Sequence, residues 1–331
     1  MNKLRVLVTG GSGFIGTHFV ELLLKNDVEI LNIDIQEPKV SSHRPLWRQC
    51  DIKAFDRLFD IFSRFSPSHV LHLAAKANLN GTTISDFPDN TIGSRNVVDC
   101  VRQEKSIERF IHTSTQYVVY PGVYPESNED LLPYTAYGES KAESERIVRT
   151  ANLDNCIWSI IRPTNIWGPW HTAFPNELWR FLGKRYYFHP GFKPIKKYYG
   201  YIENTVDQIY KLLCVASDDE VHRKVFYVTD PPIDNAVWMN AFSVALSGKP
   251  VRKIPKLMWK IMGVMGDIIK GLGRPFPIDS DRYFRLTVQE NLPYKRTLDI
   301  TGNPLLSMED GVRKCTGWIQ SYYPTLISSK D

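Results

Sequence analysis

Three glycines close to the N-terminus are the feature that most restricts how this chain can fold. Gly10, Gly13 and Gly16 lie between an apolar run at Arg5–Val8 and an amphipathic helical pattern at Phe14–Lys25. Glycine at these positions allows a sharp turn, close approach of the backbone to a pyrophosphate, and tight packing of the helix on the strand. The spacing therefore predicts a strand, a phosphate-binding loop and a helix whose N-terminus faces the anion.

Short β-rich runs alternate with longer helical patterns through the first half of the chain, which predicts the α/β class. The expected strands are Arg5–Val8, Glu29–Asp34, His69–Leu73, Arg109–Thr113 and Ile157–Ile161. The expected helices are Phe14–Lys25, Ala54–Phe65, Asn90–Gln103 and Tyr137–Thr150. We therefore expect a Rossmann fold, a doubly wound parallel sheet with helices on both faces.

The pattern changes after about Asn165, where a stretch rich in Pro, aromatic residues and Lys begins. We expect residues 1–165 to form the nucleotide-binding domain and residues 166–331 a smaller mixed α/β substrate lobe. A helix at Thr205–Leu213 and a buried strand at Val225–Val228 follow, so that residues 200–230 are expected to return to the first domain. At 331 residues the chain is long enough for both lobes.

Composition narrows the possible partners and the compartment. The net charge is only +5, from 41 Lys and Arg against 36 Asp and Glu, which argues against nucleic acid as a partner. The five cysteines lie far apart, which predicts no metal site and favours a reducing compartment. Without a signal-peptide pattern the expected location is the cytoplasm.

One apolar segment, Leu257–Leu272, is the nearest candidate for a membrane span. It is interrupted by Lys260, Asp267 and Lys270, so no membrane span is expected there. Its pattern predicts an amphipathic helix whose apolar face is buried in its own domain, with docking on a membrane surface as the alternative.

Asp34, at the end of the second expected strand, indicates which dinucleotide the loop binds. An acid at this position accepts hydrogen bonds from the adenosine ribose and repels the additional phosphate of NADP. Lys39, Arg44 and Arg48 lie downstream and could instead neutralise such a phosphate. We therefore expect NAD, with NADP as the less favoured alternative.

Candidate catalytic groups follow the fourth expected strand. Tyr137 and Lys141 stand four residues apart at the start of a helix, which places both on one face. A free tyrosine has a pKa near 10, so a neighbouring ammonium is needed to stabilise its phenolate. Thr113 and Thr115 lie at a strand end, where parallel sheets place their ligands. Together these residues predict an acid/base unit beside a hydride carrier.

With these motifs in order, the chain resembles an extended short-chain dehydrogenase/reductase of the nucleotide-sugar epimerase and dehydratase family. The matching motifs cover about the first half: the glycine loop, Asp34, Asp51-Ile52, His72-Leu73-Ala74-Ala75, Thr113 to Thr115, Tyr137 with Lys141, and Arg162-Pro163-Thr164-Asn165 running to Gly168-Pro169. The resemblance implies that Thr115 is a hydroxyl partner, Tyr137 the acid/base group, and Lys141 its activator and a ribose ligand.

The resemblance and the loop together define two sets of expected contacts. The expected cofactor residues are Gly10, Gly13, Phe14, Ile15, Gly16, Asp34, Asp51, Ile52, Leu73, Ala74, Ala75, Lys76, Thr113, Tyr137, Lys141 and Pro163. The expected substrate residues are Thr115, Gln116, Asn165, Lys197 and Arg282, with Lys196 and Arg285 as alternatives for a diphosphate. His72 and His112 lie within strands and are expected to be core residues.

Departures from the family pattern narrow the reaction. Gln116 and Tyr117 follow Thr115, where dehydratases of this family carry Asp and Glu, so dehydration is disfavoured. The 3,5-epimerase-reductases that this chain resembles carry a Cys just after the Ser/Thr and a His after the Gly-Pro. This chain has His171 near the second position but Gln116 at the first, so that reaction is only weakly supported. We expect an NAD-dependent epimerase that oxidises and re-reduces a sugar carbon, C4 by preference, of a nucleotide-diphosphate sugar.

Other functions stay open at this stage. One is an NAD(P)H-dependent reductase of a nucleotide keto-sugar. Another is a lipid or sterol dehydrogenase, suggested by the aromatic and Met-rich second half. A non-catalytic dinucleotide sensor is disfavoured, because such sensors usually lack the Tyr and Lys pair. Family members often pair through helices, so a homodimer is the expected assembly.

Overall fold

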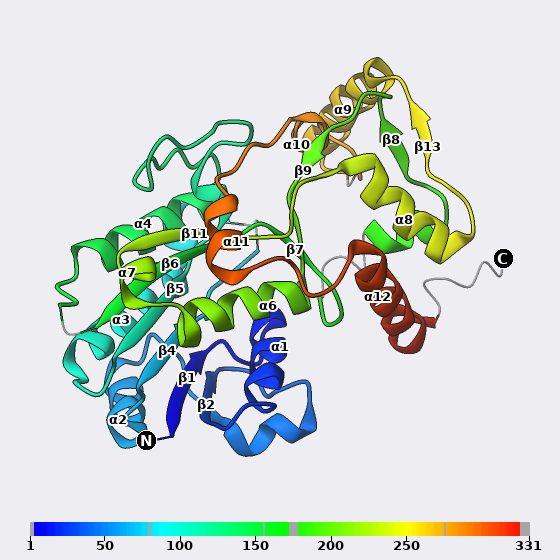
Figure 1. Cartoon of the computed structure of the whole chain (residues 1–331). Helices are drawn as coiled ribbons and strands as arrows, with labels where there is room; N and C mark the ends of the chain where they lie inside the picture. Colours follow the sequence, from blue (N-terminus) through cyan, green and yellow to red (C-terminus); the bar gives the residue numbers. More distant parts are fainter. Residues whose placement is uncertain (1–2, 79–80, 155, 172–177, 275, 325–331) are drawn as a thin grey trace.

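The computed structural model describes residues 3–78, 81–154, 156–171, 178–274 and 276–324, and Figure 1 shows their arrangement. A seven-stranded sheet forms the centre of the first lobe, with strand order β3-β2-β1-β4-β5-β6-β11. Its strands are β1 (Leu4–Thr9), β2 (Val28–Asp34), β3 (Trp47–Gln49), β4 (His69–His72), β5 (Arg109–Thr113), β6 (Ile157–Pro163) and β11 (Lys224–Val228). All neighbouring pairs are parallel, so every strand ends at the same edge of the sheet.

Helices cover both faces of this sheet because its strands alternate apolar side chains between two cores. Val6 and Val8 of β1 point into the core under α1 (Phe14–Leu23) and α6 (Ile202–Tyr210). Leu7, between them, points into the other core. That second core is covered by α2 (Phe55–Phe65), α3 (Ser94–Gln103) and α4 (Ala136–Thr150). The expected Rossmann architecture is therefore confirmed.

Most expected elements are found within a few residues of their expected bounds. The strand expected at Val225–Val228 does join the main sheet, as β11, in parallel with β6. The helix expected from Asn90 begins instead with a π-helical turn, Asp89–Gly93, and α6 starts at Ile202 rather than Thr205. The short edge strand β3 was not expected, because three residues are too few to show an alternation.

The second lobe is built from three small strand pairs and several helices. β7 (Asn165–Trp167) pairs with β10 (Tyr199–Tyr201), β8 (Phe188–Pro190) with β13 (Arg252–Ile254), and β9 (Lys196–Lys197) with β12 (Ile233–Asp234). The helices are α5 (Arg180–Gly183), α8 (Asn235–Ser247), α9 (Lys256–Gly271), α10 (Ser280–Thr287) and α12 (Met308–Tyr322); two more, α7 (Asp218–Val221) and α11 (Lys295–Thr301), pack on the first lobe. One aromatic core, centred on Trp167, Trp238 and Phe242, is continuous with the core under α1.

The prediction for Leu257–Leu272 is wrong in one respect. The segment is helical, as α9, but its apolar face is not buried: Leu257 is 67% exposed, Ile261 52% and Ile268 60%. The buried positions are instead Trp259, Gly263 and Gly266 on the opposite side. None of the helices in the described part of the chain has the length and apolar character that crossing a bilayer requires.

Candidate active site

The glycine loop has the close contacts that its sequence predicts. Gly10 has a φ of +75°, and a Cβ on it would lie 2.6 Å from the Ala74 nitrogen. A Cβ on Gly16 would lie 2.2 Å from the Gly10 carbonyl oxygen, so α1 packs directly on the loop. A Cβ on Gly13 would meet only the same carbonyl, at 3.1 Å. Gly10 and Gly16 are thus required by the protein's own packing, whereas Gly13 leaves space in front of the helix.

The N-terminus of α1 is available to an anion. Gly13 is its N-cap and supplies no side-chain hydrogen bond, so the amides of Phe14 and Ile15 receive no cap there. The amide of Thr17 is the first to bond within the helix, to the Gly13 carbonyl oxygen at 2.9 Å. Unpaired amides aligned with the helix dipole are the arrangement that binds phosphate.

A cavity of about 320 Å³ lies at the carboxyl ends of β1, β2 and β4, beside the loop. The expected cofactor residues that line it are Gly10, Gly13, Asp34, Asp51, Ile52, Leu73, Ala74, Ala75 and Lys76. Five residues that were not expected from the sequence also line it: Ile33, Ile35, Gln36, Cys50 and Asp89. Most of these are sequence neighbours of predicted residues, so the strand ends were the signal that could have identified them.

Asp34 lines this cavity, and both of its carboxylate oxygens accept backbone hydrogen bonds. Its Oδ2 accepts a hydrogen bond from the Ser12 amide at 3.0 Å, and its Oδ1 accepts one from the Gln36 amide at 2.9 Å. Partial burial raises the pKa of the carboxyl, and these two amides oppose the shift. The carboxylate keeps further lone pairs for a ligand, since each oxygen can accept more than one hydrogen bond.

The other expected cofactor residues are not among those that line this cavity: Phe14, Ile15, Gly16, Thr113, Tyr137, Lys141 and Pro163. Phe14, Ile15 and Gly16 form the first turn of α1, and Thr113 and Pro163 end β5 and β6. The Thr113 hydroxyl is buried without a hydrogen-bond partner among the described residues. A buried unpaired hydroxyl costs free energy, so a ligand group that bonds it would be favoured there.

Tyr137 and Lys141 are held by the capped start of α4. Thr135 is the N-cap, and its hydroxyl accepts a hydrogen bond from the Gly138 amide at 3.0 Å. Burial raises the pKa of Tyr137 to about 12, and a hydrogen bond with Thr115 opposes that shift. The structure therefore brings Thr115, from the end of β5, to the phenol of Tyr137. Lys141 follows one turn later and is only 2% exposed.

Burial also shifts the pKa of the Lys141 ammonium. It lowers the pKa of Lys141 to about 8, and the negative charge of Glu145 opposes the shift. His72 and His112 are fully buried, as expected of core residues, and burial holds the pKa of His72 at about 3. Both imidazoles are therefore neutral at pH 7. Lys141 is the cationic group on this face of α4.

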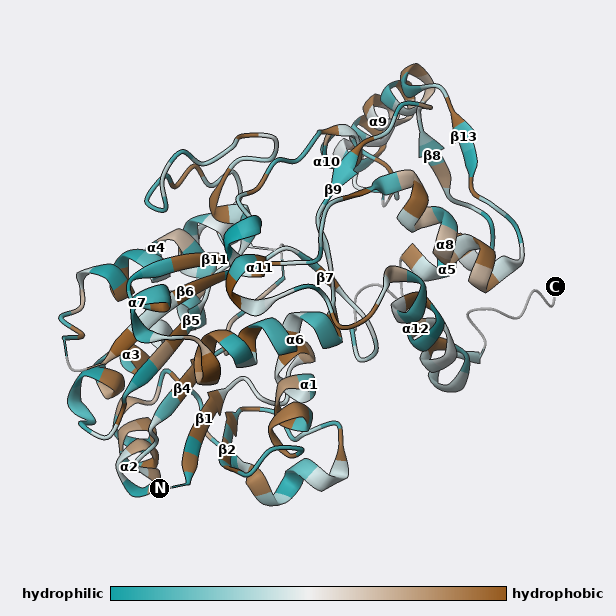
Figure 2. Ribbon diagram, in the orientation of Figure 1, coloured by the Kyte–Doolittle hydropathy of each residue, from teal (hydrophilic) through white to brown (hydrophobic). Residues whose placement is uncertain are grey.

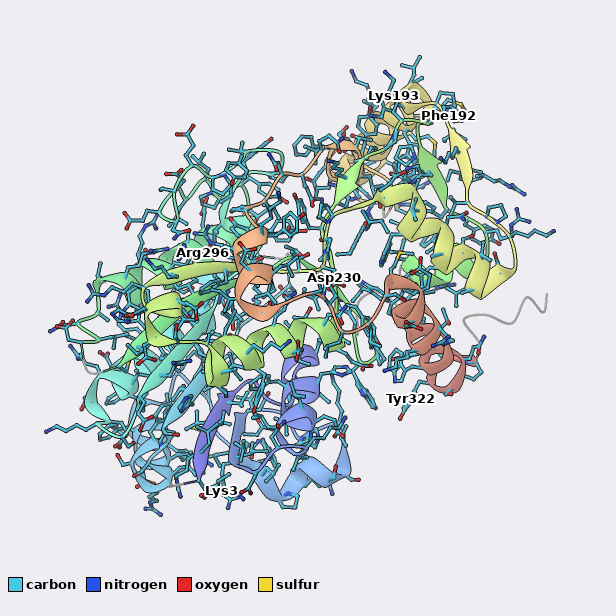
Figure 3. All side chains as sticks on the ribbon, viewed as in Figure 1. Lys3, Phe192, Lys193, Asp230, Arg296 and Tyr322 are labelled. Carbon is cyan, nitrogen blue, oxygen red and sulfur yellow. The ribbon has the colours of Figure 1, made fainter. Side chains whose placement is uncertain are left out.

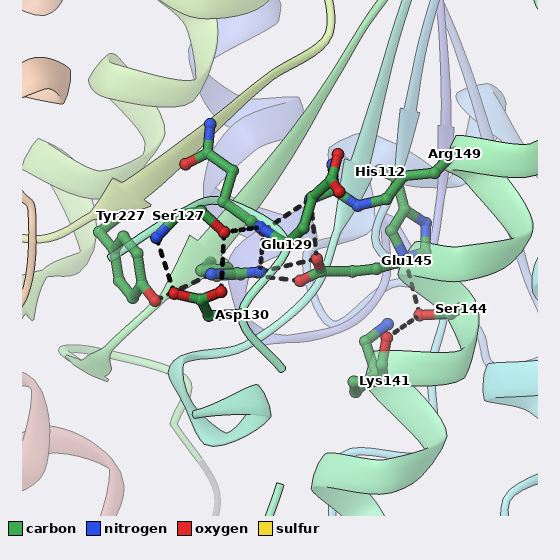
Figure 4. Close-up of polar contacts among 11 residues, drawn as sticks. His112, Ser127, Glu129, Asp130, Lys141, Ser144, Glu145, Arg149 and Tyr227 are labelled. Carbon is green, nitrogen blue, oxygen red and sulfur yellow. Dashed lines mark hydrogen bonds and ion pairs between the residues drawn. The ribbon is translucent and has the colours of Figure 1, made fainter. Parts of the chain in front are cut away.

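A hydrogen-bonded network fixes the position of this helix (Figure 4). His112 Nε2 pairs with the Ser144 hydroxyl at 2.9 Å, and that hydroxyl donates to the Lys141 carbonyl oxygen at 2.7 Å. One turn further, Glu145 accepts hydrogen bonds from Arg162 of β6. The helix is thus joined to two neighbouring strands, β5 and β6, about two turns after Tyr137.

Asn90 supports the same region from the π-helical turn before α3. Its Oδ1 accepts from the Lys76 amide at 2.8 Å, and its Nδ2 donates to the Ser140 hydroxyl at 2.8 Å. Ser140 in turn donates to the Tyr137 carbonyl oxygen at 2.7 Å. Asn90 therefore links the cofactor cavity, at Lys76, to the turn that carries Tyr137. It was expected only as a helix residue, because a lone Asn has no pattern that indicates this role.

Expected substrate residues line two of the cavities on the substrate side. The larger, of about 490 Å³, is lined mostly by apolar and aromatic residues, including Phe181, Tyr199, Trp238, Trp259 and Met262. A smaller one, of about 200 Å³, is lined by polar groups as well. Asn165 and Arg282 line both cavities, so these two expected substrate residues do lie together.

Contacts within the protein limit what some of the expected substrate residues can offer a ligand. Lys197 lines the smaller cavity, but its ammonium is 2.8 Å from Glu290 in a buried pair. Its charge is therefore largely matched within the protein, which weakens its expected role toward a diphosphate. Gln116 lies in a short 3₁₀ turn directly after Thr115. Asn165 donates from Nδ2 to the Tyr198 carbonyl oxygen at 3.0 Å, so its Oδ1 is the atom left for a ligand.

Comparison with known proteins identifies the family of this chain. A model of the NAD dependent epimerase/dehydratase family matches residues 6–186, more than half of the chain. The chain belongs to this family, and the resemblance drawn from its motifs is confirmed. The family is one of enzymes of the extended short-chain dehydrogenase/reductase type.

Individual relatives differ in what they act on. A 3-beta-hydroxysteroid dehydrogenase of Mycolicibacterium neoaurum is 24% identical over an alignment of 353 positions, covering 98% of this chain and 93% of that protein. A 3 beta-hydroxysteroid dehydrogenase/Delta 5→4-isomerase of Mycobacterium tuberculosis is 32% identical over 178 residues, about half of each chain (50% and 47%). The crystal structure of a Thermotoga maritima UDP-glucose 4-epimerase with UDP-glucose superposes with a TM-score of 0.70, at 20% identity over 96% of this chain and 99% of that one. At this identity the superposition establishes a shared fold.

Proposed function

We propose that this chain is an NAD-dependent epimerase that oxidises and re-reduces one carbinol carbon of a sugar joined to a diphosphate. The observation that carries the proposal is the hydrogen bond between Thr115, which follows β5, and Tyr137, which lies one turn before the buried Lys141 on α4. An acid/base group next to a hydride carrier is the minimum that reversible alcohol oxidation requires.

The residues present fit NAD. The loop and the uncapped start of α1 suit a pyrophosphate, and Asp34 suits the two hydroxyls of an unphosphorylated ribose. A ribose phosphate at that position would lie against the Asp34 carboxylate and be repelled. When bound, NAD supplies the hydride acceptor. Related epimerase structures, including that of Thermus thermophilus UDP-glucose 4-epimerase, contain NAD.

The protein's own groups move the proton. Tyr137, in its phenolate form, takes the proton of the substrate hydroxyl, and the Thr115 hydroxyl holds the same oxygen in line. In this proposal the role of Lys141, one turn further along α4, is to stabilise the phenolate, which burial disfavours. In the reverse step Tyr137 returns the proton to the oxygen. An epimerase further needs the keto sugar to rotate between the two steps, so that the hydride returns to the other face.

The test is a cofactor-free turnover assay. Freshly purified protein is denatured and the released dinucleotide identified by mass spectrometry; native protein is then given UDP-, GDP-, dTDP- and CDP-hexoses without added cofactor. The proposal expects released NAD and inversion of one hexose, and Tyr137→Phe should lower the rate by at least about a hundredfold. Protein that binds no NAD, or that turns over only a keto sugar with added NADPH, would sink the proposal in favour of a reductase.

A second candidate is an NAD-dependent dehydrogenase of an apolar secondary alcohol. Two observations favour it: the larger cavity is lined mainly by apolar side chains, and the steroid dehydrogenase of M. neoaurum aligns over almost the whole chain. In that case Tyr137 has the same role, but NAD is consumed in each turnover. Formation of NADH from a 3β-hydroxysteroid, with no inversion of any hexose, would select this candidate over the epimerase.

A further inference from the structure

α9 carries a continuous apolar surface that the protein does not cover. Its exposed members follow one another at spacings of one, three or four residues, which places them along one side of the helix. The residues, which we call the α9 stripe, are Leu257, Met258, Ile261, Val264, Met265, Ile268 and Leu272, with exposed fractions from 49% to 76%. Figure 2 shows α9 at the outer end of the second lobe, away from the main sheet.

The opposite side of α9 fixes the direction in which the stripe points. Trp259 is buried, and its Nε1 donates to the Phe188 carbonyl oxygen at 2.9 Å. A Cβ on Gly266 would lie 1.7 Å from the Ile278 carbonyl oxygen, and one on Gly263 would lie 3.2 Å from that of Asp279. The helix therefore packs backbone to backbone on the segment before α10, and its apolar stripe is held outward.

The surroundings of the stripe are basic. From Lys249 to Arg274 the sequence contains seven basic residues and one acidic residue, Asp267, and one of the seven, Lys270, forms an ion pair with Asp279. The Asp267 carboxylate accepts a hydrogen bond from the Ser280 amide at 3.1 Å. At the start of α9, Lys256 packs against Gly191, and the next two residues, Phe192 and Lys193, are labelled near this end in Figure 3. Phe192 is 66% exposed and extends the apolar surface.

We propose that the α9 stripe docks the protein on the surface of a lipid bilayer that contains anionic phospholipids. An outward apolar stripe with cations beside it is the composition of helices that lie in the interface plane, with the apolar side in the acyl boundary and the cations at the headgroups. Each Lys or Arg near such a surface adds to the attraction. A second copy fits this face less well, because pairing two stripes would bring the same cations together.

The proposal places the larger cavity close to the membrane. Trp259 and Met262 line that cavity from the inner side of α9, so about one helix diameter, ~10 Å, separates the cavity from the docked stripe. Substrates with an apolar part could then pass between the bilayer and the cavity over a short distance. The docking itself does not depend on which reaction the active site performs.

The experiment is co-sedimentation of the full-length chain with phosphatidylcholine vesicles, with or without phosphatidylglycerol. The wild-type chain should bind the anionic vesicles and bind less as salt rises. Ile261→Glu/Ile268→Glu should reduce the partition coefficient by at least about tenfold. Lys256→Glu/Lys260→Glu should weaken binding roughly thirtyfold, and only to the anionic vesicles. Val215→Glu/Leu305→Glu is the matched control, since these residues are 64% and 61% exposed elsewhere.

Melting temperatures establish that every variant is folded. Failure of the wild-type chain to bind anionic vesicles overturns the proposal, as does equal binding by the Ile261→Glu/Ile268→Glu variant. Analytical ultracentrifugation without lipid provides a further test. A dimer that this variant abolishes, together with absence of vesicle binding, would assign the stripe to a second copy instead.

Discussion

Arg162 donates to Glu145 through two hydrogen bonds, from Nε to Oε1 and from Nη2 to Oε2, each 2.8 Å long, and neither side chain is exposed. Arg162 also donates from Nη1 to the Tyr227 hydroxyl at 3.0 Å. These hydrogen bonds join α4 to β6 and β11. Burial disfavours the charge on Glu145, but Arg162 outweighs it and lowers the pKa of the carboxyl.

Glu145→Gln should therefore destabilise the fold. The substitution leaves the Arg162 guanidinium buried without its counter-charge, which costs about 3 kcal/mol of unfolding free energy. Urea unfolding at pH 7 measures it. Glu143→Gln on the same helix is the control, because its ion pair with Arg146 is largely exposed and should be worth less than about 1 kcal/mol. Equal effects of the two substitutions would contradict the argument.

The sign of the pH dependence follows from the lowered pKa of Glu145. A depressed carboxyl pKa stabilises the fold at pH values above the unfolded pKa, about 4.3, and this stabilisation is lost as pH falls through the folded value. Wild-type protein should thus lose unfolding free energy below about pH 4 more steeply than Glu145→Gln does. Parallel acid-unfolding curves for the two proteins would show that the pair does not contribute.

Lys141 should set an alkaline limit to turnover. Its pKa is lowered to about 8, so its ammonium loses a proton as pH rises through that value, and the phenolate of Tyr137 then loses its stabilising charge. The rate should fall above about pH 8. In Glu145→Gln the limit should move to lower pH, because the carboxylate that holds the Lys141 pKa up is gone. A pH profile of kcat for both proteins tests this. Identical alkaline limbs would exclude the effect of Glu145 on the pKa of Lys141.

Much of the fold and the cofactor side could be predicted because local signals there are strong. A buried parallel strand such as Val225–Val228 is a continuous run of apolar and aromatic residues, and the glycine loop has a spacing typical of a phosphate-binding turn. Asp34, at the end of a strand, is placed by the topology of the sheet alone. Because of that topology, nine of the expected cofactor residues line one cavity.

The substrate side could not be predicted in the same way, because its contacts join distant segments. Lys197 and Glu290 are separated by 93 positions, and nothing local shows that their charges meet. Asn90 belongs to an ordinary helical pattern, yet its side chain bonds Ser140 fifty residues away. α9 shows the converse: its periodicity predicts an amphipathic helix correctly, but periodicity alone does not say whether protein or another surface covers the apolar side.

Gly13 and Gly16 should respond differently to alanine. In Gly13→Ala the new Cβ meets only the Gly10 carbonyl oxygen, at 3.1 Å, and φ is −72°, so stability should change by no more than about 1 kcal/mol. NAD binding should nonetheless weaken at least about tenfold, because the methyl group occupies the path of the pyrophosphate. Gly16→Ala should lose about 1–3 kcal/mol by overpacking. Calorimetry with and without NAD separates the change in stability from the change in NAD affinity. Unchanged NAD affinity in Gly13→Ala would contradict a pyrophosphate site at Gly13.

Asp34→Ala should change the preference between NAD and NADP. Loss of the carboxylate removes an acceptor for the ribose hydroxyls, which weakens NAD binding roughly tenfold or more, and removes the repulsion that excludes NADP. Fluorescence titration with both dinucleotides measures the ratio. Asp27→Ala is the control, since that side chain is 91% exposed and pairs with Lys3 next to the opposite end of β2. An unaltered ratio in Asp34→Ala would assign the discrimination to another residue.

Arg282 provides the test that separates the two candidate substrates. It lines both substrate-side cavities together with Asn165. If a diphosphate binds here, Arg282→Ala should raise KM at least about tenfold with little change in kcat, because a charged hydrogen bond is lost in the ground and transition states alike. An apolar alcohol should keep its KM. Arg313→Ala on α12, 78% exposed, is the control. Unchanged KM for the diphosphate substrate would place its anion elsewhere and leave the apolar cavity as the better guide to specificity.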